Sequence, residues 1–427
     1  MAKSPWKRFA KKSLEERLAL IHQLGLLSPK EWEDLAQNQT LPVSTANQMS
    51  ENVLGTLALP FAILPELLVD GRTYTVPMAI EEPSVVAAAT YAASLFNRSG
   101  GCHTNIHNRL MLGHITLTDV KEPQTVVAIL EDHQEELLTL ANAAYPSIVK
   151  RGGGARAITV KSLGEGFVSL YLYVDTQEAM GANMLNTMLE ALTPQVESLT
   201  GYKSLMAILS NYALESLVTA TIELDWRFLS RNTQEAEAMA NRICQASQLA
   251  QIDPYRAVTH NKGIFNGLDA LLLATGNDWR AIEAGAHAYA SQSGSYRGLT
   301  QWRNHKTKQK LIGHITLPLP LATKGGSIGL NPTVTAAHTL LGQPTAKELM
   351  AVAASLCLAQ NFAAMKALVT DGIQKGHMNL QLRSLALLAG AKEHEVDDLV
   401  SSLKAHQPAN LALAQALLKQ KRKAHNK

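Results

Sequence analysis

Hydrophobic and polar positions change their spacing along the chain, and helix signals stand near both ends of the first hundred residues. Ser13-Leu-Glu-Glu16 is a capping box, in which the serine and glutamate side chains satisfy each other's free backbone groups, so a helix should begin there. An alanine-rich run from 84 to 96 follows Pro83, and proline is suited to the first turn of a helix. This run therefore predicts a buried helix.

A period of two replaces the helical spacing between about 109 and 212. Ile115 and Leu117 alternate with threonines, and a second apolar run reads as a strand from 167 to 174. Three consecutive glycines predict a turn between them, and apolar positions near helical spacing predict a helix from Ala179 to about Ser198. We therefore expect a separate, smaller α+β unit in this part of the chain.

Helical spacing dominates again from Asn241 onward. Thr345-Ala-Lys-Glu348 is another capping box, and it opens a long segment that stops at Gly372. Gly372 and Gly376 predict a short loop that permits a hinge. Two further helical stretches follow it, 378–391 and 396–423. We expect them to form a small helical appendage.

Composition adds the expectation of an ordinary soluble enzyme. Of the 427 residues, 46% are hydrophobic and 18% are charged, which is close to the average for soluble globular proteins. The formal net charge is only +3, so no large field for nucleic acid is implied. No run reaches the roughly 18 apolar residues of a membrane span, and the first twenty residues lack the apolar stretch of a signal peptide. The sequence predicts a cytoplasmic protein without a membrane or nucleic-acid partner.

The three cysteines sit far apart and in odd number. Cys102, Cys244 and Cys357 show no CxxC spacing, which argues against a disulfide framework and against a zinc site. We expect a reducing compartment and no bound metal.

Two adjacent carboxylates, Glu81 and Glu82, stand just before the alanine-rich helix. If packing draws one of them into the interior, its pKa rises and it could donate a proton near neutral pH. Acidic residues are also ordinary at helix starts, where they offset the helix dipole. The pattern alone leaves both interpretations open.

Lys262 and Asp278 flank an apolar run of the most unusual segment of the chain. A lysine near hydrophobic surface keeps its charge only with a carboxylate partner, and such a pair can hold an ammonium where a carbonyl oxygen gains negative charge. A structural ion pair explains the pattern equally well. His377 follows the glycine hinge and has the pKa range for proton delivery, although a lone histidine is more often a cap or surface residue.

The segment from Glu178 to Asn183 opens the helix of the smaller unit. A helix N-terminus with a glycine that permits close approach suits a phosphate group. The G-x-G-x-x-G fingerprint of Rossmann dinucleotide-binding folds does not occur in the chain. A Rossmann fold is therefore disfavoured.

Five segments, in this order, resemble the signature segments of class II 3-hydroxy-3-methylglutaryl-coenzyme A (HMG-CoA) reductases. They are Glu51-Asn-Val-Leu-Gly55, Val76 to Ser84, Glu178 to Asn183, His260 to Arg280 and Gly376-His-Met378. The likeness runs nearly end to end. It implies the reduction of HMG-CoA to mevalonate and CoA in the mevalonate (isoprenoid) pathway, with two molecules of NADPH or NADH and no metal.

The resemblance also implies roles for single residues. Glu82 would be the catalytic glutamate, Lys262 would polarise the reacting carbonyls, and Asp278 would link and tune both. His377 would protonate the departing CoA thiolate. The expected contacts to the HMG group are Ser84, Arg256, Asn266 and Gln360, with Arg256 suited to its terminal carboxylate. The expected contacts to the nicotinamide cofactor are Tyr145, Glu178, Met180, Gly181, Asn183 and Asn211.

The family fold implied by the resemblance is α+β. It has a large, mostly helical HMG-CoA-binding domain at 1–108 and 213–371, and an inserted small NAD(P)-binding domain at 109–212 that is ferredoxin-like rather than Rossmann. A C-terminal helical flap covers 372–427. Active sites in the family lie at a dimer interface, so we expect a homodimer or an assembly of dimers.

Some positions depart from the family pattern. Tyr145 stands where some relatives carry an aspartate that can bind a ribose hydroxyl and repel a 2′-phosphate. With Lys150 and Arg151 close in sequence, we expect NADPH to be preferred over NADH. Glu178 stands where many relatives have aspartate, and its longer side chain could alter ribose contacts. Gln381 replaces a flap histidine of some relatives.

One further expectation concerns CoA binding by the N-terminal segment. Two alternative functions also remain open for the whole chain. Lys11 and Lys12 lie near an expected contact to a CoA phosphate, although a solvated helix start explains them as well. The same fold could oxidise mevalonate with NAD, or it could be a catalytically silent CoA-binding protein. The presence of all four implied catalytic residues argues against the silent protein.

Overall fold

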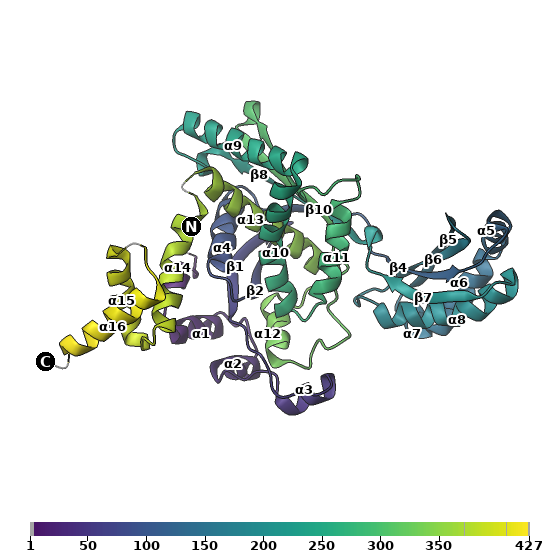
Figure 1. Ribbon diagram of the computed structural model, residues 1–427, viewed down its shortest axis with the longest axis horizontal. Coiled ribbons are helices and arrows are strands. Elements are labelled where there is room, and N and C mark those ends of the chain that lie inside the picture. Colours follow the sequence, from purple (N-terminus) through teal and green to yellow (C-terminus); the bar gives the residue numbers. More distant parts are fainter. Residues whose placement is uncertain (1–3, 371, 407, 426–427) are drawn as a thin grey trace.

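The computed structural model describes residues 4–370, 372–406 and 408–425, with the side chains of 373–380 and 424–425 left aside. The chain forms a central body, a smaller lobe on one side of it, and a cluster of C-terminal helices on the other side (Figure 1). Each of these three parts has its own cluster of buried hydrophobic residues. The fold is therefore a mixture of helices and sheets.

The central body contains an antiparallel hairpin and a four-stranded antiparallel sheet. The hairpin strands are β1 (Phe61–Val69) and β2 (Arg72–Ala79), and the sheet strands, in spatial order, are β3 (His103–Ile106), β8 (Leu217–Asp225), β10 (Lys310–Pro318) and β9 (Thr300–His305). Buried positions alternate along β8 and β10, so one face of the sheet lies against the core. Helices dominate after Asn241, as predicted. The spacing of hydrophobic positions did not predict β9 and β10, which complete this sheet.

Nine helices of the described chain belong to the body or precede it. They are α1 (Leu14–Gln23), α2 (Pro29–Ala36), α3 (Val43–Met49), α4 (Val85–Arg98), α9 (Thr233–Ile252), α10 (Pro254–Ala274), α11 (Trp279–Ala290), α12 (Pro332–Leu340) and α13 (Ala346–Val369). The predicted capping boxes at Ser13 and Thr345 are both present. The predicted buried helix is α4, whose inner positions include Ala89, Ala92 and Phe96, all 0% exposed.

Helix α13 is the central helix of the body. It contacts α4, α10 and β8. Within the described part of the chain, it is the one helix long and apolar enough to cross a membrane, but 78% of its apolar window is buried in the body. This burial is typical of a helix in a protein core, whereas a helix that spans a membrane exposes apolar side chains to lipid.

The smaller lobe folds around its own antiparallel sheet. Its strands, in spatial order, are β5 (Gly154–Gly164), β6 (Phe167–Asp175), β4 (Met111–Leu117) and β7 (Ser204–Ser210), and its helices are α5 (Pro123–Asp132), α6 (Gln134–Ala144), α7 (Pro146–Lys150) and α8 (Ala182–Thr200). The order along the chain is strand, helices, strand, strand, helix, strand. The two predicted strands are confirmed as β4 and β6, and the predicted helix is α8, which begins at Ala182 rather than at Ala179.

Three helices close the chain: α14 (Ile373–Leu388), α15 (Glu393–Ala405) and α16 (Leu411–His425). The predicted loop between Gly372 and Gly376 is wrong, because α14 begins directly after Gly372 and includes Gly376. Gly372 itself has a φ of +82°, a left-handed conformation that suits the sharp turn between α13 and α14. The predicted stretch 396–423 is divided between α15 and α16.

Candidate active site

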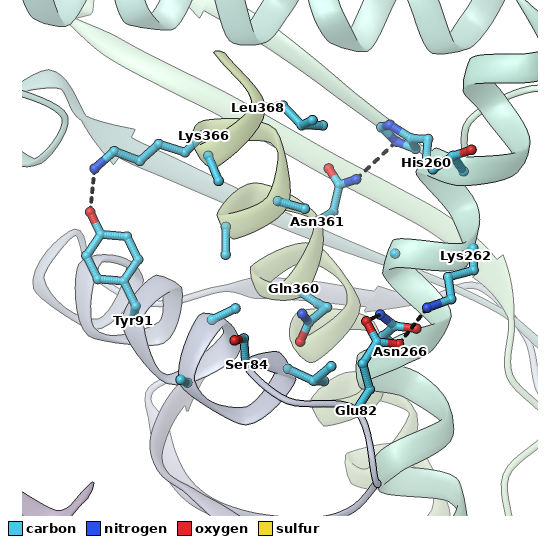
Figure 2. A pocket seen from close by; sticks show the side chains of 18 of the residues that line it. Glu82, Ser84, Tyr91, His260, Lys262, Asn266, Gln360, Asn361, Lys366 and Leu368 are labelled. Carbon is cyan, nitrogen blue, oxygen red and sulfur yellow. Dashed lines mark hydrogen bonds and ion pairs between the residues drawn. The ribbon is translucent and has the colours of Figure 1, made fainter. Parts of the chain in front are cut away.

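A pocket of about 770 Å³ opens among α4, α10 and α13. Figure 2 shows Glu82, Lys262 and Asn266 together on one side of this pocket and His260 with Asn361 on another. These residues come from the loop before α4, from α10 and from α13. The pocket therefore gathers segments that are far apart in the sequence.

Glu82 contacts two side chains of α10. Lys262 Nζ donates to Glu82 Oε2 at 2.6 Å, and Asn266 Nδ2 donates to Glu82 Oε1 at 3.0 Å. Lys262 and Asn266 are four residues apart on one helix, so they share a face and can hold one carboxylate between them. An ammonium and a carboxyl group in direct contact at a pocket can stabilise a developing negative charge and transfer a proton.

The carboxylates are less buried than the sequence suggested. The Glu82 side chain is 36% exposed, and Glu81 is exposed to solvent. The Lys262 side chain is 60% exposed. The pattern had left open whether one of these glutamates is drawn into the interior, and the structure places Glu82 at the open side of the pocket rather than in the core.

Three polar atoms of residues that line the pocket have no hydrogen-bond partner within the described chain, and His260 Nδ1 is one of them. Ser84 Oγ and Gln360 Oε1 are both buried and unpaired. Ser84 has a φ of +74°, an uncommon conformation for a residue with a side chain, and such strain is often found at functional sites. Buried polar groups normally have partners, so these two atoms are available to a ligand.

Arg256 brings a positive charge to the same pocket. Burial lowers the pKa of this guanidinium, yet an arginine stays charged at physiological pH. Its side-chain contact among the described residues is a weak one, from Nη2 to Met365 Sδ at 3.8 Å. A half-buried guanidinium of this kind suits a carboxylate ligand.

A buried polar network behind the pocket was missed by sequence reasoning. His260 Nε2 lies 2.6 Å from Thr300 Oγ1 and 3.1 Å from Asn361 Nδ2, and Asn361 Oδ1 accepts from Trp302 Nε1 at 2.9 Å. Burial lowers the pKa of His260 to about 3, so its imidazole is neutral. The network connects α10 and α13 to β9. No local sequence pattern predicts it, because its members are spread over a hundred residues.

Asp278 lies elsewhere in the chain. It caps α11, where Oδ1 accepts from the backbone N–H of Ala281 at 3.2 Å, and it pairs with Arg280 at 3.4 Å. Helix α10 continues for twelve residues beyond Lys262, or about 18 Å along its axis, before Asp278 is reached. An ion pair of Lys262 with Asp278 of the same chain is therefore wrong, and Lys262 pairs with Glu82 instead. The side chain of His377 lies outside the described residues.

The turn before α8 has the features expected of a phosphate-binding site. Gly181 is the N-cap residue with a φ of +94°, and a Cβ there would lie 2.2 Å from Thr176 Cγ2, so only glycine fits. No side chain caps α8, which leaves its first backbone N–H groups available to an anion. Met180 is half-buried against the core of the lobe, and Asn183 is exposed.

The other predicted cofactor residues lie around the same lobe. Tyr145 is half-buried between α6 and α7, and Asn211 is exposed just after β7. Glu178 contacts the central body instead of pointing to solvent: its Oε2 accepts from Thr323 Oγ1 at 2.6 Å and from the N–H of Ala346 at 2.7 Å. Its predicted contact to a ribose stays a prediction.

A second pocket of about 1090 Å³ lies between the N-terminal segment and α4. Both pockets are lined by Glu82, Ser84, Ala87 and Tyr91, so the two pockets are adjacent. Lys7, Arg8 and Arg17 contribute positive charge to its lining, whereas the predicted Lys11 and Lys12 do not line it. Within the described chain, no group of three or more His, Cys, Asp or Glu residues could hold a metal ion.

Comparison with known proteins relates the chain to a single family. A sequence model of the family described as hydroxymethylglutaryl-coenzyme A reductase matches residues 13–382. The 3-hydroxy-3-methylglutaryl-coenzyme A reductase of Archaeoglobus fulgidus is 42% identical over 395 residues, which cover 92% of this chain and 89% of the archaeal protein. A probable 3-hydroxy-3-methylglutaryl-coenzyme A reductase of Borreliella burgdorferi is 33% identical over 390 residues, which cover 90% of this chain and 88% of the Borreliella protein.

Solved structures agree with this relationship. A 3-hydroxy-3-methylglutaryl-coenzyme A reductase from Streptococcus pneumoniae shares 55% sequence identity with a TM-score of 0.85, and the match covers 97% of this chain and 99% of the other. A second structure, described as the class II enzyme from Streptococcus pneumoniae bound to NADPH in open conformations, has a TM-score of 0.84 and 55% identity. That match covers 86% of this chain and 100% of the other.

Proposed function

Because the chain belongs to the HMG-CoA reductase family as a class II, bacterial-type oxidoreductase that forms mevalonate, we propose that the pocket among α4, α10 and α13 holds the HMG group. One observation carries the proposal: Lys262 Nζ lies 2.6 Å from Glu82 Oε2 at this pocket. The stepwise reduction of a thioester to an alcohol needs a positive charge near the carbonyl oxygen and a group that can transfer a proton to it, and an ammonium beside a carboxyl group can meet both needs.

The chemistry assigned to these side chains follows from their charges. The reduced nicotinamide supplies a hydride to the carbonyl carbon in each of two steps. In both steps Lys262 stabilises the negative charge that develops on the carbonyl oxygen, and Glu82 supplies a proton to the alkoxide. Between the steps the mevaldyl-CoA hemithioacetal would return its hydroxyl proton to Glu82 as the bond from carbon to sulfur breaks, which leaves mevaldehyde and a Glu82 ready for the second step. His377 is proposed to protonate the departing CoA thiolate. Asp278 is proposed to tune Glu82 and Lys262.

The substrate contacts are proposed from the unpaired groups of the pocket. Arg256 would bind the terminal carboxylate of HMG, because it is half-buried and lacks a carboxylate partner among the described residues. Ser84 and Gln360 would pair with the remaining polar atoms of HMG, and Asn266 would orient Glu82. The CoA portion would extend into the adjacent second pocket, where Lys7, Arg8 and Arg17 can meet its phosphates.

The smaller lobe is proposed to hold the nicotinamide cofactor. Its order of strands and helices agrees with a ferredoxin-like unit at 109–212, set between two parts of an HMG-CoA-binding domain at 1–108 and 213–371. Gly181 and Asn183 at the start of α8 would receive the phosphates, with Tyr145, Met180 and Asn211 nearby. Residues 372–427 would form the flap that closes over the site.

A homodimer is proposed as the working assembly. The outward face of α10 exposes Tyr255 at 90%, Val258 at 56% and Leu273 at 37%, and Lys262 lies on this same apolar face. Exposed apolar patches of this kind mark protein contacts. A second copy seated there could bring its Asp278 to the Lys262 and Glu82 that the first copy provides.

The cofactor preference is tested by the initial rate of absorbance loss at the reduced nicotinamide band with HMG-CoA. NADPH and NADH are compared at equal concentration, with the wild type and with Tyr145→Asp. We expect the wild type to be faster with NADPH. The variant should shift toward NADH, because a carboxylate at position 145 would bind a ribose hydroxyl and repel the 2′-phosphate.

Each other outcome separates the alternatives. A wild type that is faster with NADH remains a reductase but contradicts the argument from Tyr145. Faster oxidation of mevalonate with NAD than reduction of HMG-CoA would favour the catabolic direction. Absence of HMG-CoA-dependent oxidation with either cofactor would favour a silent CoA-binding protein.

A further inference from the structure

The turn before α8 is fastened to one short segment of the central body, residues 321–324, which we call the strap. Arg109 Nη2 donates to the carbonyl of Leu321 in the strap at 2.6 Å and to the carbonyl of Ala179 in the turn at 3.0 Å. The backbone N–H groups of Thr323 and Lys324 donate to the carbonyl of Glu178 at 2.9 and 3.2 Å. Three of these four hydrogen bonds join the lobe to the body, and the fourth, from Arg109 to Ala179, holds the turn within the lobe.

The Glu178 carboxylate adds two more bonds to the same junction. Its Oε2 accepts from Thr323 Oγ1 at 2.6 Å and from the N–H of Ala346, the first residue of α13, at 2.7 Å. A carboxylate at the start of a helix is favourable because it meets free N–H groups and the positive end of the helix dipole. The Arg109 guanidinium is only 8% exposed, and the nearby Glu178 and Asp175 carboxylates oppose the lowering of its pKa by burial.

The other side of the strap is held by Asn277. Asn277 Oδ1 accepts from the N–H of Ala322 at 2.8 Å, and Asn277 Nδ2 donates to the carbonyl of Ala322 at 3.1 Å. Asn277 also donates to Thr275 Oγ1 at 3.0 Å. The next residue along the chain is Asp278, the N-cap of α11. The strap thus joins the turn before α8 to the residue that precedes Asp278.

We propose that Glu178 and Asn277 are positioning residues for the reduction and act through this strap. Glu178 holds the turn before α8 against the body, and Asn277 fixes the position of Asp278. The nicotinamide that donates the hydride and the carboxylate of Asp278 therefore keep one position relative to each other. This inference rests on the proposed function, because it assumes the cofactor at α8 and a catalytic Asp278. It replaces the expected ribose contact of Glu178 with a structural contact to the strap.

The first test compares Glu178→Gln with Glu31→Gln. Glu31 is a matched control, since its carboxylate also accepts from a threonine hydroxyl, Thr339 Oγ1 at 2.6 Å, and from a backbone N–H, that of Ser28 at 2.8 Å. For Glu178→Gln we expect kcat to fall on the order of tenfold to a hundredfold, because a small misplacement of reacting groups is that costly. The dissociation constant of NADPH, from fluorescence titration of the free enzyme, should stay within about twofold of wild type.

The isotope effect on kcat separates positioning from simple stability. With NADPH deuterated at the transferred position, Glu178→Gln should show a larger isotope effect than wild type, because misaligned hydride transfer becomes rate-limiting. Glu31→Gln should change the melting temperature at most, with kcat and the isotope effect unchanged. A fall in kcat shared equally by both variants would overturn the proposal.

The second test uses Asn277→Ala alone and combined with Glu178→Gln. If both residues act through the strap, the double variant should lose no more kcat than the worse single variant, whereas independent sites would multiply their losses. Asn304→Ala is the control, because Asn304 also uses its amide in two bonds, accepting from Trp226 Nε1 at 3.0 Å and donating to Asn241 Oδ1 at 2.8 Å. Its kcat should equal that of wild type.

Two results would overturn the inference while leaving the proposed function intact. One is a raised NADPH dissociation constant with an unchanged kcat in Glu178→Gln, which identifies a ribose ligand. The other is a multiplicative loss in the double variant. A wild type without HMG-CoA-dependent NADPH oxidation would instead contradict the proposed function itself, so the two failures are distinguishable.

Discussion

At the scale of single residues, the contact between Glu82 and Lys262 defines the site. The two residues are 180 positions apart, yet Lys262 Nζ lies 2.6 Å from Glu82 Oε2. The pair is at the open side of the pocket, with the lysine side chain 60% exposed, so its strength depends on how far the bound substrate and the closed assembly exclude water. Exposed ion pairs add little to stability, which agrees with the catalytic role proposed for this pair.

Replacement of the lysine tests this assignment. Lys262→Ala should lower kcat at least on the order of a hundredfold, because a preorganised positive charge aimed at the carbonyl oxygen is lost. The steady-state rate of NADPH oxidation measures the effect, and far-UV circular dichroism checks that the variant is folded. Lys306→Ala is the control, since Lys306 forms a similar exposed pair with Glu237 at 2.9 Å. Equal activity of Lys262→Ala and wild type would refute the mechanism.

At the scale of elements, α10 carries a half-buried acidic residue, Asp269, three residues beyond Asn266. Burial and the neighbouring Glu283 carboxylate on α11 raise the pKa of Asp269 to about 8, and its Oδ1 is buried without a partner. In the unfolded chain an aspartate has a pKa of about 3.9. The folded state therefore keeps this proton over a pH range where the unfolded state has lost it. The resulting stability is complete below pH 3.9 and is lost as the pH rises through about 8.

Asp269→Asn should remove this pH dependence. The amide resembles the protonated acid and can donate to Glu283, so the variant should be more stable than wild type at pH 9, with a difference that shrinks toward pH 5. The difference in stability is followed by the urea concentration at the unfolding midpoint, measured for both proteins from pH 5 to pH 9 at one fixed protein concentration. Asp132→Asn, at the exposed end of α5, should leave the pH dependence of wild type unchanged. If Asp269→Asn stabilised the protein more at pH 5 than at pH 9, the predicted direction of the pH dependence would be wrong.

At the scale of the whole molecule, the separation of Asp278 from Lys262 within one chain requires an explanation. Asp278 caps α11 and pairs with Arg280 at 3.4 Å, whereas Lys262 lies on the exposed apolar face of α10. A symmetric dimer can join two such groups, because each subunit then contributes a different part to both sites. The proposed homodimer would bring the two groups together and would also cover the apolar face of α10.

Mixing two inactive variants tests the composite site. Lys262→Ala and Asp278→Asn should each be nearly inactive, and subunit mixing or co-expression should restore up to about a quarter of the wild-type rate. About half of the dimers would then be mixed, and each would hold one site with both wild-type residues. The rate of NADPH oxidation and the mass by analytical ultracentrifugation are measured together. A dimer that forms but restores no activity would place both residues of a site in the same subunit.

The success of prediction differed between local and distant features. The capping boxes at Ser13 and Thr345 were predicted because both partners of each lie within four residues. Strand β8 was not identified, although Val218, Ala220, Ile222 and Leu224 alternate along it as a half-buried strand requires. The loop predicted around Gly376 was wrong because a glycine is tolerated inside a helix and its tertiary contacts decide between helix and turn.

The sequence by itself determined the local structure at the helix starts and the two central strands of the lobe. Through its signature segments it also indicated the family and, as separate candidate residues, Glu82 and Lys262. Only the tertiary structure decided that Lys262 pairs with Glu82 instead of Asp278, that Glu178 contacts Thr323 and Ala346, and that His260 is buried with Asn361. The physical reason is distance along the chain. Capping and alternation depend on neighbours a few residues away, whereas these contacts join residues more than a hundred apart and form only when α10, α13 and the strap pack together.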